Sequence, residues 1–116
     1  MDAAAQRPSS RQLSRVAMYV LLAIGPEERH GYAIMAEVAR LTGDEVRLGP
    51  GAVYTTIRRL LDDGLIEESG ERPDQDDQRR RYYRLTGLGR ALAASNVRRM
   101  EMLISAVRPW VLEANR

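Results

Sequence analysis

A turn, a one-sided helix and two short strands follow one another without interruption between residues 49 and 85, and this succession restricts the fold more than any other feature. Gly49-Pro50-Gly51 marks the turn. Four apolar residues after it have helical spacing and predict a helix that ends at Gly64. They are Val53, Ile57, Leu60 and Leu61. Residues 65–69 and 80–85 then predict the strands of a hairpin with a long tip.

Two further helices are predicted before this turn and one after the hairpin. The first ends at Gly25-Pro26, with Ser9 or Ser10 as its N-cap, and the second has Gly43 as its C-cap. Their apolar positions are Leu13, Val16, Ala17, Val20, Leu21 and Ile24, then Tyr32, Met35, Val38 and Leu41. Thr86 is a suitable cap for a last helix, expected to run from about residue 88 past residue 107.

This order of elements defines the expected fold class, which is mainly α with a small β-hairpin (α+β). It is the arrangement of a winged helix-turn-helix domain with added N- and C-terminal dimerisation helices. We expect a flexible N-terminus at residues 1–8, the winged helix-turn-helix domain at residues 9–86 and the C-terminal dimerisation helix at residues 87–116.

Composition excludes several classes of protein. With no cysteine and a single histidine, His30, the chain offers no thiolate metal site or zinc cluster, and we expect no cofactor. No apolar run approaches the roughly 20 residues that span a bilayer, and residues 1–11 lack a secretion signal, so a cytoplasmic protein without membrane contact is expected. All 18 basic residues are arginine, which suits phosphates and guanine edges, although coding bias in a GC-rich genome produces the same skew.

Four segments of the sequence resemble the PadR family of bacterial transcriptional regulators. They are YVLLAI (residues 19–24), HGYAIMAEV (30–38), LGPGAVYTTIRRLLDDGLIE (48–67) and RRRYYRLTGLGR (79–90), in the family's order and spacing. The single helix after the hairpin is similar to the smaller branch of the family. The resemblance implies a regulator, ordinarily a repressor, that binds double-stranded operator DNA. Two mild departures are Ala52-Val53-Tyr54, where Thr-Leu-Tyr is commoner, and Gly87, where the family often has proline.

The outward face of the helix that follows the turn is the predicted DNA-reading surface. Because its apolar residues turn inward, Thr55 and Arg58 point outward and are the best candidates to read base edges in a major groove. Small residues at the helix start permit close approach, and a helix N-terminus favours phosphate. The resemblance implies that the Tyr54 hydroxyl is directed at the DNA backbone; a half-buried core tyrosine is the alternative. The predicted contacts are Gly51, Ala52, Tyr54, Thr55, Arg58 and Arg59.

Arg79, Arg80 and Arg81 stand where the second strand of the hairpin begins. From this position a winged domain touches phosphates or the flanking minor groove, whereas a lone basic triplet is ordinarily solvated surface. Phosphates would repel the acidic stretch 74–77, so that stretch either points away from DNA or holds the arginines when DNA is absent.

An apolar seam on the last helix, with spacings of three and four residues, predicts contact between two protomers. Its members are Ala93, Asn96, Met100, Leu103, Val107 and Trp110. The first helix is more apolar than a three-helix core requires, so Val16 and Val20 are predicted at the same interface. A twofold homodimer would hold its two reading helices about one DNA turn apart, roughly 34 Å, on a palindromic operator.

Trp110 and His30 each have two interpretations. Some relatives hold flat aromatic drugs beside a tryptophan of the last helix, so the resemblance permits a small aromatic effector bound at Trp110. A plain interface anchor is favoured, because Pro109 is expected to kink or end the helix just before it. His30 belongs to the family's His-Gly-Tyr helix start, where capping and packing are favoured over pH sensing.

No nucleophile with a neighbouring base and no phosphate-binding glycine motif is visible, so an enzyme is not expected. The remaining alternative to a sequence-specific DNA-binding regulator is a winged-helix module whose third helix binds another protein. Salt separates the two, because the log affinity for DNA falls by about 0.9 per phosphate neutralised for each tenfold rise in salt.

Overall fold

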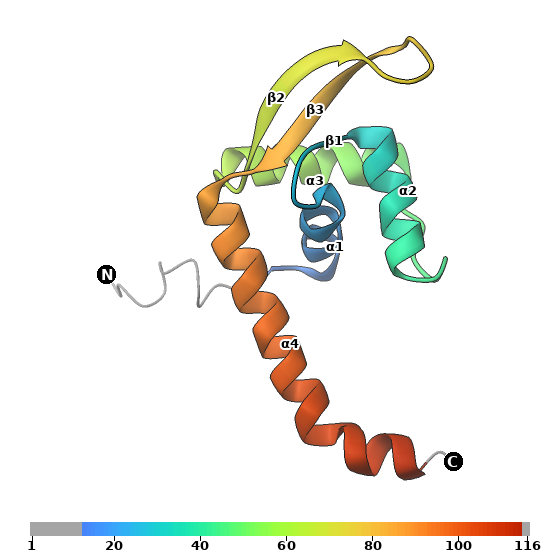
Figure 1. Ribbon diagram of the computed structural model, residues 1–116, viewed down its shortest axis with the longest axis vertical. Coiled ribbons are helices and arrows are strands. Elements are labelled where there is room, and N and C mark those ends of the chain that lie inside the picture. Colours follow the sequence, from blue (N-terminus) through green and yellow to red (C-terminus); the bar gives the residue numbers. More distant parts are fainter. Residues whose placement is uncertain (1–12, 115–116) are drawn as a thin grey trace.

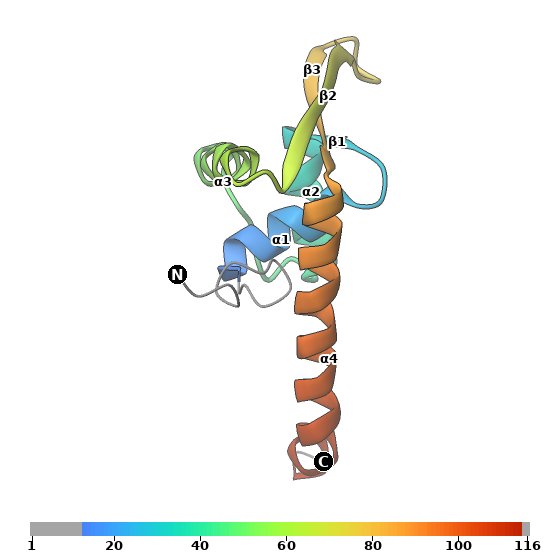
Figure 2. The same cartoon turned by 90° about the vertical axis from the view of Figure 1, so that its left-hand side faces the viewer.

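The computed structural model of the protein describes residues 13–114. Its elements are α1 (Arg15–Ile24), β1 (Arg29–His30), α2 (Gly31–Leu41), α3 (Pro50–Asp62), β2 (Ile66–Pro73), β3 (Arg79–Leu85) and α4 (Gly87–Ala114) (Figure 1). This content confirms the predicted α+β class. The β2–β3 hairpin, called the wing below, and α4 extend in opposite directions from the group formed by α1, α2 and α3 (Figure 2).

Helix ends follow the predicted glycines but not the predicted serines. Ser14 caps α1, its Oγ accepting a hydrogen bond from the backbone N–H of Ala17 at 3.1 Å. The expectation of Ser9 or Ser10 as this cap was therefore wrong, because the helix begins later than apolar spacing alone suggested; both serines lie outside the described residues. Gly43 and Gly64 follow α2 and α3 with φ of 58° and 73°, the left-handed conformation that lets the chain leave a helix.

The sheet is larger than the predicted hairpin. It has the order β1-β3-β2, in which Arg29 and His30 of β1 pair antiparallel with Tyr83 and Tyr82 of β3. No strand was predicted at β1. Strand β2 also continues past Ser69 to Pro73, through a register shift between Glu68 and Gly70. In the added part of β2, the carboxylate of Glu71 pairs with Arg79 of β3 at 3.5 Å; these polar positions have no apolar pattern that would reveal a strand.

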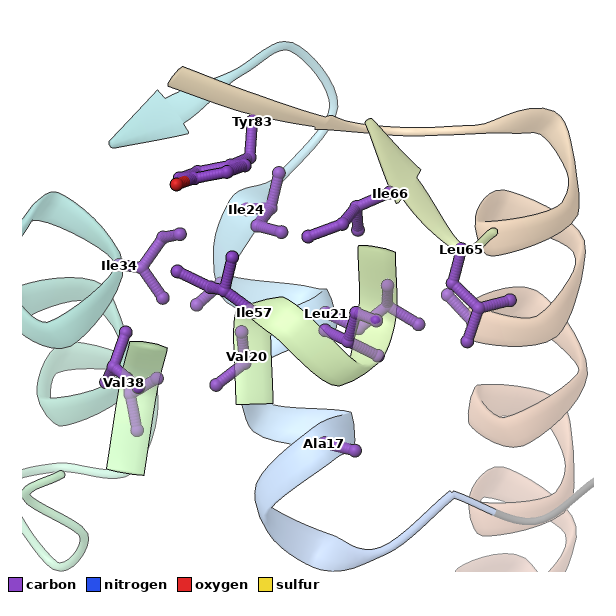
Figure 3. Packing of buried hydrophobic residues seen from close by; sticks show 14 of the residues in the cluster. Ala17, Val20, Leu21, Ile24, Ile34, Val38, Ile57, Leu65, Ile66 and Tyr83 are labelled. Atoms are coloured by element: carbon purple, nitrogen blue, oxygen red, sulfur yellow. The ribbon is translucent and has the colours of Figure 1, made fainter. Parts of the chain in front are cut away.

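One core joins the helices, the base of the wing and the start of α4 (Figure 3). Val20 and Leu21 of α1 pack there with Ile34 of α2 and Ile57 of α3. Tyr83 of β3 closes the core from the sheet side (Figure 3). Further members are Ile66 of β2 and Leu92 of α4. The core thus continues past residue 87, where the sequence suggested a domain boundary, into the first turns of α4.

Helix α4 begins as predicted, since the Oγ1 of Thr86 accepts a hydrogen bond from the backbone N–H of Gly89 at 3.0 Å. Pro109 does not end the helix, which continues to Ala114 and bends near its C-terminal end (Figure 1). A proline removes one helical hydrogen bond, and a bend accommodates its ring. Within residues 13–114, no helix is both long and apolar enough to cross a membrane.

Candidate nucleic-acid interface

Helix α3 has the two faces that its sequence predicts. Val53, Ile57 and Leu60 are buried in the core. The residues predicted to contact DNA are all exposed: Gly51, Ala52, Tyr54, Thr55, Arg58 and Arg59. Gly49 is the N-cap of α3 and provides no side-chain hydrogen bond, and Pro50 is the first residue of the helix. Its positive N-terminal end is therefore not satisfied by a capping side chain, which suits the approach of a phosphate.

Arg58 and Arg59 differ from the wing arginines in being unpaired. Within residues 13–114, neither guanidinium forms a salt bridge or hydrogen bond, whereas Arg79 and Arg81 pair with Glu71 and Glu68 across the hairpin. An exposed arginine without an acidic partner leaves all its donors available to an anionic or base-edge ligand. The pattern makes the middle of α3 the most accessible cationic part of this surface.

A groove of about 320 Å³ runs between α3 and the wing. Arg58 and Tyr54 line it from α3, and Arg81 and Tyr83 line it from β3. One guanidinium lines each side of this groove, and the carboxylate of Asp62 lines it as well. Because Arg81 also pairs with Glu68, the charge of Arg58 is the more available of the two to a phosphate.

The predicted triplet Arg79, Arg80 and Arg81 does not act as one patch. Successive side chains of a strand point to opposite faces, so Arg79 and Arg81 share the face of Tyr83, which packs toward the core (Figure 3). Arg80 lies on the other face, in a hollow lined by His30, Tyr32 and Asp74. The Nε of Arg80 donates to Asp74 at 3.0 Å. The sequence left two alternatives for the acidic stretch 74–77. One of them, that this stretch holds an arginine, is confirmed for Arg80.

Tyr54 is exposed on α3 and also packs against α2, so the predicted contact of its hydroxyl with DNA stays a prediction. Its side chain is 42% exposed, yet its ring lies directly over Gly31 at the start of α2. A Cβ at position 31 would overlap the Tyr54 hydroxyl and stand 2.8 Å from Cε1. The sequence did not reveal this contact between Gly31 and Tyr54, because the two residues are distant in the chain. The only signal was a glycine at a helix start, where other residues are usually preferred.

Replacing Gly31 with alanine is expected to move the Tyr54 ring and weaken DNA binding about fivefold, the size of one neutral hydrogen bond. Fluorescence anisotropy with operator DNA measures the change, and thermal unfolding should show a nearly unaltered midpoint. Tyr54→Phe is the matched control, because it removes the hydroxyl and leaves the ring in place. The double variant should bind no more weakly than the weaker single variant; unaltered affinity of Gly31→Ala would contradict the role.

His30 caps α2 and packs, as the sequence favoured. Its Nδ1 accepts the backbone N–H of Ala33 at 3.2 Å, and its ring meets Tyr82 edge-on at 5.3 Å. Burial lowers the pKa of His30, and the positive charge of Arg80 adds to this, while Asp74 opposes it. The neutral ring is therefore the folded form near pH 7, and Nδ1 stays free to accept.

Among residues 13–114, no three His, Cys, Asp or Glu side chains gather to hold a metal ion.

This lowered pKa predicts a loss of stability below about pH 6.5, the ordinary histidine value. Above it, His30 is neutral in both states; below it, the unfolded chain takes up a proton before the folded one, so the free energy of unfolding falls as pH falls. Urea unfolding at pH 7.5 and 5.5 measures the slope. His30→Asn keeps a capping acceptor and should flatten the slope, because the chain has no other histidine. An identical slope in both proteins would contradict this.

The predicted dimer residues separate into exposed and buried members. Leu103 and Trp110 of α4 are 64% and 66% exposed, and Met100 is also exposed. Val16 and Val107 are partly exposed. Val20 was wrongly expected at the interface, since it is fully buried in the core of its own protomer. Helical spacing marks an apolar residue without saying which neighbour covers it.

Comparison with known proteins agrees with this geometry. A sequence profile of the transcriptional regulator PadR-like family matches residues 20–95. Transcriptional regulator Rv3488 of Mycobacterium tuberculosis is 33% identical over 96 residues, which cover 83% of this chain and 85% of that protein. An uncharacterized 37.1 kDa protein in transposon TN4556 of Streptomyces fradiae is 36% identical over 90 residues, 78% of this chain and 24% of that protein. The chain thus spans about a quarter of the length of the Streptomyces protein.

Solved structures share the fold. Bacillus subtilis PadR in complex with operator DNA superposes with a TM-score of 0.60 at 18% identity, covering 72% of this chain and 46% of that one. At this identity the likeness shows a common winged-helix architecture and nothing finer.

Proposed function

This chain belongs to the PadR-like family of transcriptional regulators, and from that membership we propose that it binds operator DNA sequence-specifically as a homodimer. The observation that carries the proposal is the pair of unpaired guanidinium groups, Arg58 and Arg59, on the exposed face of α3. A protein of the same fold, Bacillus subtilis PadR, is solved in complex with operator DNA, and this supports DNA as the ligand.

Each exposed residue has a proposed role. Helix α3 enters the major groove, where Thr55 and Arg58 contact base edges and Arg59 contacts a base or a phosphate. The open helix start at Gly51 and Ala52 and the Tyr54 hydroxyl meet the DNA backbone. From the wing, Arg79 and Arg81 exchange their glutamate partners for phosphates. Such an exchange costs little, because exposed ion pairs contribute at most about 1 kcal/mol.

The mode of regulation is proposed to be repression through a palindromic operator. Met100, Leu103, Val107 and Trp110 would join the two α4 helices, with Trp110 as an interface anchor. A small aromatic effector beside Trp110 would release the DNA only if it favoured a different angle between the two domains.

A binding titration tests the function directly. Purified protein is titrated by anisotropy against its own promoter region and against a scrambled duplex of equal length, at two salt concentrations. Selective binding that weakens steeply with salt supports the regulator. Equal, weak binding to both duplexes together with capture of a protein partner would favour the interaction module.

Arg58→Ala is expected to reduce operator affinity by about 1–3 kcal/mol and to bring operator and scrambled duplex closer together. The reason is that a base-reading arginine discriminates, whereas a phosphate contact strengthens both duplexes alike. Arg98→Ala is the matched control, since it removes the same charge from an exposed position of α4. If both variants keep the discrimination of the parent protein, α3 does not read the operator through Arg58.

A further inference from the structure

The surroundings of Arg80 differ from those of its two neighbours in β3. Its side chain is 21% exposed, against 63% for Arg79 and 62% for Arg81. Asp74 holds its Nε at 3.0 Å, and the guanidinium lies over the ring of Tyr32, 4.5 Å from the centroid. Asp74 is itself only 11% exposed. The guanidinium is thus already engaged on an anion and an aromatic face.

These contacts join parts of the fold that are distant in sequence. Asp74 belongs to the turn at the tip of the wing, while Tyr32 lies in the first turn of α2. Strand β1 pairs with β3 at Tyr82 and Tyr83, so Arg80 adds a contact nearer the tip than the sheet provides. We call the contacts among Asp74, Arg80 and Tyr32 the wing clamp.

A second layer on the same side of the wing reinforces the clamp. Arg72 of β2 lies over the ring of Tyr82 at 3.8 Å and pairs with Glu28, which also accepts the hydroxyl of Ser69 at 2.7 Å. Glu28 directly precedes β1. The inner side of the wing therefore contacts the rest of the domain at two places, once through Arg80 and once through Arg72 and Ser69.

We propose that Arg80 is a positioning residue for DNA binding: by joining Asp74 to Tyr32 it fixes the wing on α2 and so places Arg79 and Arg81 beside α3. The inference rests on the proposed function and replaces a phosphate-contacting role for Arg80. It follows that Asp74, although negative and on the wing, supports DNA binding.

Asp74→Asn separates the two roles by the sign of its effect. If Arg80 touched phosphate, Asp74 would compete with the DNA, and its neutralisation would strengthen binding. If Arg80 positions the wing, the weakened clamp lowers operator affinity, roughly tenfold for one displaced charged contact. Asparagine is suitable because the Oδ1 of Asp74 accepts the N–H groups of Asp76 and Gln78, and asparagine keeps such an acceptor in the turn.

Two further variants complete the binding experiment. Arg80→Lys keeps the charge and would still bind a phosphate, but it loses the planar group that lies on Tyr32, so we expect the same roughly tenfold loss. The double variant should bind no more weakly than the weaker single one. Glu67→Gln is the matched control: it neutralises a carboxylate that pairs with Arg84 at 2.7 Å at the base of the wing, and it should shift affinity less than about twofold.

Hydrogen exchange of the free protein provides a readout that needs no DNA. Faster exchange at the wing tip in Asp74→Asn and Arg80→Lys, but not in Glu67→Gln, is expected. Tighter operator binding by Asp74→Asn, or unaltered exchange in both variants, would overturn the inference while leaving the proposed function intact. Failure of the parent protein to bind DNA in a salt-sensitive manner would instead overturn the function, and the exchange data would still report on the clamp.

Discussion

Replacing Gly89 with alanine is expected to lower the free energy of unfolding by about 3 kcal/mol, the upper end of the usual range for overpacking. Gly89 is the third residue of α4 and is buried where this helix passes the start of the wing. A Cβ there would overlap the carbonyl oxygen of Leu65 and stand 2.9 Å from its carbonyl carbon. Both atoms are backbone, and the oxygen already accepts the N–H of Thr86 at 3.1 Å, so neither moves without breaking the junction.

Thermal or urea unfolding measures this loss, which is a large part of the roughly 5–15 kcal/mol that stabilises an ordinary domain. Gly87→Ala is the matched control. It lies two residues earlier in the same helix and has nothing within 4 Å of its added Cβ, so its effect should stay within about 0.5 kcal/mol. Equal midpoints for the two variants would mean that α4 shifts easily against Leu65, contrary to the packing described.

Those parts of the fold that depend only on residues close together in the chain could be predicted from the sequence. Glycines at 43 and 64, the apolar spacing in α3 and the cap at Thr86 each depend on residues a few positions apart, and each was predicted correctly. Strand β1 was missed because two polar residues become a strand only by pairing with Tyr82 and Tyr83, more than fifty positions away. Tertiary pairing of this kind leaves no periodic pattern.

The candidate site was predictable to the level of an element but not of a side-chain role. The arginines on the outward face of one helix and at the start of the following strand were sufficient to indicate α3 and the wing as the candidate DNA-binding elements. The separation of Arg80 from its neighbours required the strand register and the position of Tyr32. Gly31 gained significance only through the ring of Tyr54. Val20, an apolar residue assigned to the dimer, is in fact covered by its own protomer. In each case the deciding contact joins residues distant in sequence.

Leu103→Asp is expected to convert the proposed dimer to a folded monomer. Leu103 is 64% exposed at the edge of a hollow that it shares with Met18 and Tyr19 of α1, and Met100 and Trp110 continue the exposed stripe on either side of it. An interface between two such stripes would enclose the new carboxylate without a partner, at a cost of several kcal/mol. Loss of the second half-site contact would then weaken operator binding on the order of 10²-fold, the gain that linked binding ordinarily provides.

Met102→Asp is the control that makes this test specific to the stripe. Met102 is more exposed than Leu103, at 73%, but 3.6 residues per turn place it off the line of Met100, Leu103 and Val107. Sedimentation velocity should therefore report a dimer for Met102→Asp and a monomer for Leu103→Asp, with equal thermal midpoints when both are measured as monomers at high dilution. If both variants remain dimeric, the protomers meet elsewhere, and the spacing of the two α3 helices on DNA must be set by a surface other than α4.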